Sequence, residues 1–167
     1  LFFLFDLNKD KFMDRGEWEM QRKRNDARNG LYAIRLDGAK GDVTPTHIRW
    51  RYEKGLGNLP SPLIYRDVVY LLKEGGILTA LDPKTGAVIK QGRLEGAVDG
   101  YSASPVAGDG KLYFASAKGK LTVVEAGRDW KVLNVADTKE DIWGTPALDK
   151  GRIYVRTQGA LYCFGKS

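Results

Sequence analysis

The sequence has little of the chemistry on which many enzymes depend. Its 167 residues include one cysteine, Cys163, and one histidine, His47. A single cysteine excludes an internal disulfide framework and an all-cysteine zinc site, and a single histidine excludes any mechanism that needs two histidines of this chain. The longest apolar run, residues 1–5, is far too short to span a bilayer. Proline is scarce, with 6 residues against 20 glycines, and this excess of glycine favours tight turns between short strands.

Composition and charge limit the class of protein and the kinds of partner further. Hydrophobic residues make up 43% of the chain, which is enough to build a core. The formal net charge is +6, and Arg22, Lys23 and Arg24 form a basic run of the kind that contacts phosphates. However, residues 1–29 carry seven Lys or Arg and six Asp or Glu, a net charge of only +1. We therefore interpret the run as a solvated helix face and expect no nucleic-acid partner.

Three short motifs recur along the chain at one period. The prolines of the first are 43 and 41 residues apart, and so are the tyrosines of the second, whereas the four members of the third are 47, 43 and 40 residues apart. Three independent motifs at one spacing indicate structural repeats. The members are Ser61-Pro62-Leu63, Ser104-Pro105-Val106 and Thr145-Pro146-Ala147; Val68-Val69-Tyr70, Lys111-Leu112-Tyr113 and Arg152-Ile153-Tyr154; and residues 31–34, 78–81, 121–124 and 161–164.

Each repeat is predicted to contain four short antiparallel strands, which is the signature of a β-propeller blade at this period. In the middle repeat, strands at 102–106 and 111–116 flank a hairpin turn at 108–110, whose glycines allow positive φ. We predict an all-β fold with blades at about 60–94, 100–135 and 142–167, the last without its outer strand. Residues 30–53 supply the third and fourth strands of a further blade.

Residues 1–29 lack this alternation, and we predict that they form a helical insertion separate from the blades of residues 30–167. Residues 17–28 are rich in helix formers, and Asn29-Gly30 is typical of a helix stop.

Residues 6–17 match the twelve-residue calcium loop of an EF-hand. Calcium is a hard cation that takes six to eight oxygen ligands, and the loop supplies them from fixed positions. Here the ligands would be the side chains of Asp6, Asn8 and Asp10, the backbone carbonyl of Phe12, Asp14 through water, and both carboxylate oxygens of Glu17.

One position departs from the calcium-loop pattern. Lys11 stands where such loops have glycine, and a non-glycine residue at positive φ costs roughly 1 kcal/mol. We expect this to weaken calcium binding without abolishing it. No second loop of this kind is present in the sequence, which favours a structural clamp over a calcium sensor. An acidic, capped helix–turn–helix without metal is the alternative.

The remaining candidate residues have structural interpretations. We predict that His47, in a polar stretch before a strand, has a structural or solvent role, and that Cys163 is a buried core thiol because it alternates with aromatic residues. Trp50 and Trp130 are predicted to pack between blades. Trp143 is predicted to do the same or to line a central pocket.

Two segments carry a resemblance to a known family, Leu78-Thr79-Ala80-Leu81-Asp82-Pro83-Lys84-Thr85-Gly86 and residues 104–113. They resemble the pyrroloquinoline-quinone-like (PQQ-like) propeller repeats, which also occur in BamB-type outer-membrane assembly propellers. The whole chain resembles the C-terminal part of bacterial proteins of this kind that carry an EF-hand insertion. The resemblance implies a periplasmic or cell-envelope protein.

The same resemblance raises the question of quinone chemistry. Quinoprotein dehydrogenases of this family have an adjacent cysteine pair, a tryptophan under the quinone and calcium bound to the cofactor. This chain has only Cys163, its calcium-like loop lies in the insertion, and residues 87–91 lack the tryptophan usual after Thr-Gly. We therefore expect no PQQ cofactor and name no catalytic residue.

Two functions stay open. The first is a non-enzymatic binding or scaffolding module of the bacterial cell envelope. The second is the C-terminal part of a PQQ-dependent dehydrogenase whose active site lies in other blades. Propellers close with four to eight blades, so in either case we expect upstream blades or a protein partner to complete the ring.

Overall fold

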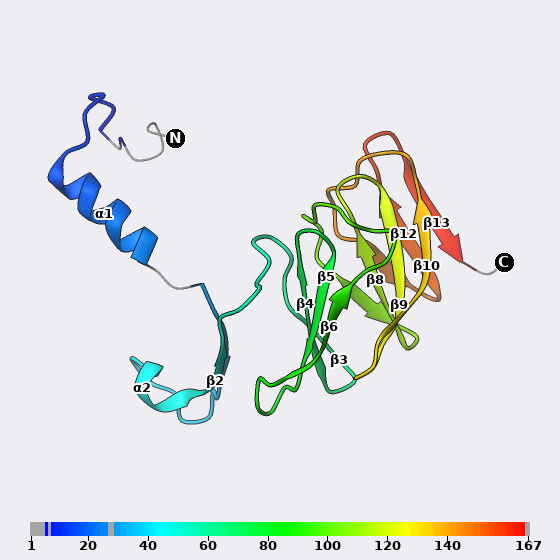
Figure 1. Ribbon diagram of the computed structural model, residues 1–167, viewed down its shortest axis with the longest axis horizontal. Helices are drawn as coiled ribbons and strands as arrows, with labels where there is room; N and C mark the ends of the chain where they lie inside the picture. Colours follow the sequence, from blue (N-terminus) through cyan, green and yellow to red (C-terminus); the bar gives the residue numbers. More distant parts are fainter. Residues whose placement is uncertain (1–5, 7, 27–28, 166–167) are drawn as a thin grey trace. The chain divides into compact units, whose positions relative to one another are not determined.

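The computed structural model describes residues 6, 8–26 and 29–165 (Figure 1). The chain forms two compact units, residues 1–30 and residues 31–167. The described residues of the first include the helix α1 (Arg15–Asp26), and those of the second include the strands.

A reciprocal capping box starts helix α1. The N–H of Glu17 donates to Oδ1 of Asp14 at 2.9 Å, and the N–H of Asp14 donates to Oε2 of Glu17 at 3.1 Å. These two bonds satisfy backbone donors that a helix N-terminus otherwise leaves unpaired. The helix therefore begins two residues before the predicted start, and the last two residues of the predicted range lie outside the described residues.

The second unit is a series of antiparallel sheets in which sequence neighbours pair, as predicted for propeller blades. Blades 2 and 3 have four strands, and the described residues of blades 1 and 4 have two and three. Blade 1 is β1 (Leu31–Ile34) and β2 (Ile48–Tyr52); blade 2 is β3 (Leu63–Tyr65), β4 (Val68–Lys73), β5 (Ile77–Leu81) and β6 (Val88–Arg93); blade 3 is β7 (Val106–Gly108), β8 (Lys111–Ala115), β9 (Lys120–Glu125) and β10 (Lys131–Asp137); blade 4 is β11 (Ala147–Asp149), β12 (Arg152–Arg156) and β13 (Leu161–Gly165). The short helix α2 (Thr44–His47) leads directly into β2.

The strand predicted at 102–106 is wrong over most of its length, because β7 begins only at Val106. The residues before it connect blades instead of extending a sheet. The N–H of Ser61 donates to Oγ of Ser104 at 3.0 Å, and the N–H of Ser104 donates to Oγ1 of Thr145 at 3.1 Å. The repeated Ser/Thr-Pro motif is thus a blade-to-blade hydrogen-bond link.

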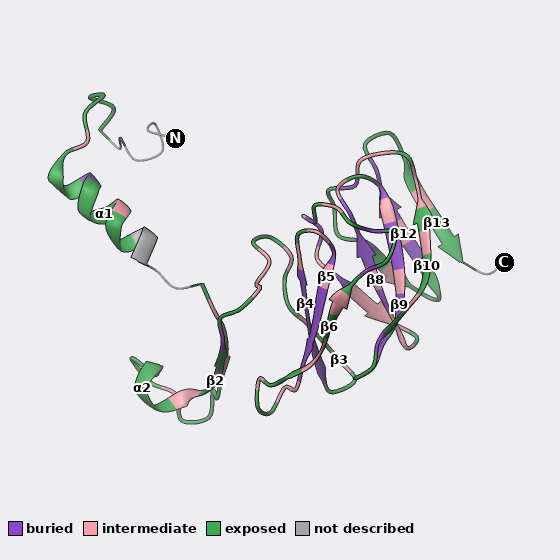
Figure 2. Ribbon diagram, viewed as in Figure 1, coloured by how far each residue is buried: buried purple, intermediate pink, exposed green. Residues whose placement is uncertain are grey.

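The core lies between successive blades. Figure 2 shows buried positions concentrated on the strands of blades 2 and 3. Tyr70 and Leu78 of blade 2 share one cluster with Leu112, Phe114 and other residues of blade 3. A second cluster joins blades 3 and 4, and a third joins blades 1 and 2. Each sheet therefore buries its apolar face against its neighbour.

Two of the predicted packing tryptophans lie in these interfaces. Trp130 is buried in the cluster between blades 2 and 3. Trp50 is half-buried and donates from Nε1 to the carbonyl oxygen of Pro83 at 2.8 Å. A Cβ at Gly86 would lie 2.6 Å from the Trp50 ring, and Gly86 has a φ of +71°. Glycine is therefore required there both for the turn and for the approach of the ring.

The first hairpin of blades 2, 3 and 4 uses the same left-handed turn. Both central residues have positive φ, as in a type I′ turn. The pairs are Arg66 (49°) and Asp67 (54°), Asp109 (50°) and Gly110 (73°), and Lys150 (45°) and Gly151 (77°). Of these three blades, only blade 2 has two non-glycine residues in this turn. A glycine at one of them would remove part of the backbone strain that positive φ causes.

We predict that Asp67→Gly raises the free energy of unfolding by about 0.5–1 kcal/mol, because glycine adopts positive φ without a Cβ penalty. The free energy of unfolding is measured by urea titration with circular dichroism as the signal. The reverse change, Gly151→Asp, is the matched control, since open space surrounds the Cβ position of Gly151. It should lower stability by a similar amount. A destabilised Asp67→Gly variant would contradict this account of the turn.

Candidate functional sites

The hydrogen bonds of the predicted calcium loop turn its polar side chains toward its own backbone. Asp6 accepts from the N–H of Lys11 at 2.9 Å through Oδ2. Asn8 accepts from the N–H of Asp10 at 2.9 Å, and Asp10 accepts from the N–H of Phe12 at 2.8 Å. The side chains at positions 1, 3 and 5 therefore hold the loop in a tight curve.

The curve requires left-handed backbone at the position where calcium loops have glycine. Lys11 has a φ of +69°, as the loop pattern predicts for this position, and Lys9 has a φ of +61°. Asp6 and Glu17 are each only 6% exposed. Oδ1 of Asp6 is buried and has no hydrogen-bond partner within the described part of the loop. A buried carboxylate oxygen of this kind is a suitable ligand for a hard cation.

The four carboxylates of the predicted ligand set, those of Asp6, Asp10, Asp14 and Glu17, are not placed around one centre. In the described residues, no group of three or more His, Cys, Asp or Glu side chains is placed to hold a metal ion. Asp14 and Glu17 accept backbone hydrogen bonds instead, in the arrangement of the metal-free alternative. The loop thus supplies oxygen donors of the type that calcium prefers, but its carboxylates would have to move toward one another to share a cation. Calcium binding stays a prediction.

Three other predicted residues lie at the surface. Trp143 is 64% exposed, so it does not pack between blades; it lines a cavity of about 220 Å³ together with Gly144 and residues 156–158. Cys163 is exposed, and its predicted burial is wrong because β13 forms the edge of a three-stranded sheet. The ring nitrogens of His47 contact the Thr46 hydroxyl and the Asp37 carbonyl, in keeping with its predicted structural role.

The sequence motifs do not reveal a hydrogen-bonded cluster around the Glu140 carboxylate, whose member Thr157 lines the cavity with Trp143. Oε2 of Glu140 accepts hydrogen bonds from the Thr157 hydroxyl and from the N–H of Gly159, and Oε1 accepts from the Tyr162 hydroxyl at 3.2 Å. The Thr157 hydroxyl and then the Gly159 N–H lower the pKa of the Glu140 carboxyl below its ordinary value of 4.5. This cluster ties the segment that enters blade 4 to the turn between β12 and β13.

The Glu140 cluster repeats an arrangement found 41 residues earlier. Asp99 accepts from the Ser116 hydroxyl at 2.8 Å and from the N–H of Lys118 at 3.1 Å. The shared acid, hydroxyl and turn amide show that the cluster belongs to the blade repeat and is a structural connector. The spacing of Asp99 and Glu140, 41 residues, could have predicted this cluster. Because one residue is aspartate and the other glutamate, the two do not form an obvious motif.

The paired sheets, the inter-blade cores and the repeated connectors define the chain as part of a β-propeller built from PQQ-like repeats. The family model described as "Outer membrane protein assembly factor BamB" matches residues 21–167, and the chain belongs to this family. The matched range begins after residues 6–17, so the calcium-like loop lies outside it. No curated protein matches the sequence.

Solved structures show the same fold at low sequence identity. BamB from Moraxella catarrhalis has a TM-score of 0.64 and 23% identity, over 83% of this chain and 40% of that one. Quinohemoprotein alcohol dehydrogenase ADHIIG from Pseudomonas putida HK5 has a TM-score of 0.54 and 17% identity, over 66% and 19%. A europium-containing methanol dehydrogenase has a TM-score of 0.54 and 14% identity, over 79% and 32%. This chain therefore spans less than half of each.

In the part of the chain that the structure describes, no helix has the length and apolar character needed to cross a membrane.

Arg22 and Lys23 of α1 are exposed, which agrees with a solvated basic face.

We predict that Glu140→Gln lowers the melting temperature at pH 7, because an amide cannot accept all the bonds that the carboxylate accepts. Since the folded-state pKa is lowered, the stabilisation by the carboxylate is present above pH 4.5 and is lost as the pH falls through the folded-state pKa. The gap between wild type and variant should therefore shrink below pH 4.5 in melts followed by circular dichroism.

The matched control for this experiment is Glu125→Gln. Glu125 is exposed at the end of β9, and its carboxylate has no hydrogen bond or ion pair with another described residue. Its replacement should leave the melting temperature unchanged at pH 7. A gap between wild type and Glu140→Gln that stays constant from pH 7 to pH 3 would contradict the role of the carboxylate charge.

Proposed function

We propose that this chain is a non-enzymatic binding or scaffolding part of a β-propeller in the bacterial cell envelope. Its membership of the family described as an outer membrane protein assembly factor supports the envelope location. The observation that carries the binding role is the open edge of blade 4, where β13 has a strand on one side only among the described residues.

The exposed side chains of β13 support this role. Phe164 pairs with Ile153 in blade 4 as Val124 pairs with Leu112 in blade 3. Val124 is fully buried in the core between blades 2 and 3, and β10 continues its sheet, whereas Phe164 is 42% exposed. Unpaired edge strands with apolar side chains are templates for an added strand. A fourth strand on β13, from upstream blades or from a protein partner, would bury Phe164 and complete the blade.

Site-specific photo-crosslinking in cells that produce the protein tests this proposal. A photoreactive amino acid at Leu161, exposed on β13, should crosslink to a cell-envelope protein or to another segment of the same protein, as identified by mass spectrometry. The control position is Leu133, exposed on the outer strand of complete blade 3. Equal crosslinking from both positions, or none from Leu161, would count against an edge-pairing role.

Dehydrogenase activity is the competing function. The cavity beside Trp143 measures about 220 Å³, below the roughly 300–1,000 Å³ usual for small-molecule sites, so a quinone site would have to lie in other blades. Addition of PQQ and calcium should therefore give no bound-quinone absorption and no alcohol oxidation. A quinone spectrum that appears on mixing would replace the scaffolding role with quinone-dependent oxidation.

We also propose that residues 6–17 bind calcium as a local clamp. The buried oxygen of Asp6 that lacks a partner in the described loop and the left-handed backbone at Lys11 support it. So does the tight curve that the side chains at positions 1, 3 and 5 hold. Bound calcium would replace mutual repulsion of four carboxylates by attraction to a common cation.

We predict that Lys11→Gly tightens calcium binding by about fivefold, because it removes roughly 1 kcal/mol of backbone strain from the loop. Titration calorimetry measures the affinity. Glu17→Gln should weaken binding at least tenfold, since it removes one charge from a bidentate ligand. The control Glu19→Gln changes a neighbouring exposed carboxylate that pairs with Arg15 and should leave the affinity unchanged. Absence of calcium heat from both wild type and Lys11→Gly would refute the clamp.

A further inference from the structure

The interface between blades 2 and 3 provides a template for the next one. Tyr65, the last residue of β3, reaches across to the first hairpin of blade 3, where its hydroxyl accepts from the N–H of Gly110 at 3.0 Å. The Arg66 guanidinium lies 5.5 Å from the centre of the Tyr65 ring. One aromatic ring thus fills the space beside the hairpin turn and satisfies a turn amide.

The interface between blades 3 and 4 has the same backbone but lacks this ring. Gly108 occupies the place of Tyr65, since it ends the strand β7 and pairs with Lys111 as Tyr65 pairs with Val68. Gly151 occupies the place of Gly110 in the turn, with a similar φ. Its N–H has no hydrogen-bond partner among the residues that the structure describes.

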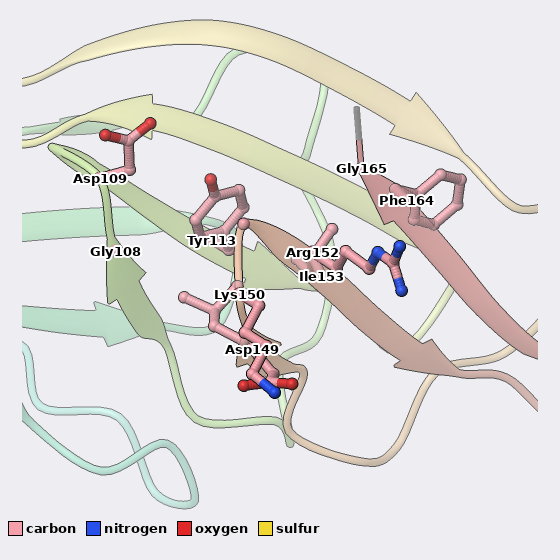
Figure 3. A pocket seen from close by; sticks show the side chains of 11 residues that line it. Gly108, Asp109, Tyr113, Asp149, Lys150, Arg152, Ile153, Phe164 and Gly165 are labelled. Atoms are coloured by element: carbon pink, nitrogen blue, oxygen red, sulfur yellow. The ribbon is translucent and has the colours of Figure 1, made fainter. Parts of the chain in front are cut away.

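A cavity of about 420 Å³ lies at this position (Figure 3). Its volume is within the range of small-molecule sites. Its walls combine apolar and aromatic groups from both blades, and its rim carries the turn residues of the β7–β8 and β11–β12 hairpins. The apolar walls are Tyr113, Leu148, Ile153 and Phe164.

We propose that this cavity binds the side chain of a tyrosine from a protein partner, with the phenol hydroxyl on the N–H of Gly151. The internal repeat identifies the occupant, because Tyr65 fills the corresponding space one blade earlier and uses the corresponding amide. The proposal rests on the proposed binding role, but it concerns the cavity between blades 3 and 4, which β13 lines with Phe164 and Gly165, and not an added strand on β13.

Nuclear magnetic resonance of the ¹⁵N-labelled 167-residue chain tests the proposal with N-acetyltyrosinamide as the probe. The amide signals of Gly108 and Gly151 should shift on titration. N-acetylphenylalaninamide should bind about 3- to 10-fold more weakly, because it cannot accept from the Gly151 N–H. Equal affinity for the two amides, or no shift at Gly151, overturns the proposal.

Gly108→Tyr supplies the missing ring from within the chain and should abolish the shifts at Gly151. The new Cβ would lie 2.9 Å from Cδ1 of Leu148, the movable end of that side chain. The control is Gly144→Tyr, the same change where open space surrounds the Cβ position, and it should leave the titration unchanged. Undiminished binding by a folded Gly108→Tyr variant overturns the proposal.

Phe164→Ala provides a second test that does not depend on the folding of Gly108→Tyr. Phe164 is an exposed residue of the cavity wall, so its removal leaves the core intact. It should weaken tyrosinamide binding at least threefold, and unchanged affinity overturns the proposal. Loss of crosslinking at Leu161 together with intact tyrosinamide binding would reject the edge role alone, which keeps the two proposals distinguishable.

Discussion

Face-to-face packing of successive sheets is the constraint on which the rest of the structure depends. Each blade is thin, and a two- or three-stranded sheet has little core of its own. Tyr70 and Leu112 are fully buried only because blade 2 lies against blade 3. The hydrogen-bonded connectors through Asp99 and Glu140 set how one blade follows the next. Stability is therefore shared between neighbours, as in other repeat architectures.

The sequence predicts the blades well because their turns and apolar alternation recur with a fixed period. Gly110 and Gly151 mark the same left-handed turn, and the strands around them follow. Prediction fails where a residue bonds to another blade or where a neighbouring strand is lacking. Ser104 bonds to Thr145 and so delays β7, and Cys163 is exposed because its sheet ends at β13. Neither cause is local in sequence.

The candidate sites show the same division. The spacing of residues 6–17 predicts the oxygen ligands and the positive φ at Lys11. It does not predict where each carboxylate points, because that depends on the positions of the backbone N–H groups to which the carboxylates bond. The inter-blade cavity could have been found from the sequence by aligning the repeats, since Gly108 stands where Tyr65 stands one period earlier. A missing side chain in a repeat is a weaker signal than a conspicuous motif.

The link from Ser61 to Ser104 to Thr145 gives the array a direction. Ser61 and Ser104 each donate a backbone N–H to the hydroxyl of the next motif, so Ser104 accepts from the unit before it and donates to the unit after it. A segment of 41 or 43 residues, the spacing of these motifs, carries one donor and one acceptor of this link. Duplication or deletion of one whole period therefore rejoins matching ends, and propellers with different numbers of blades can arise from this architecture by such steps.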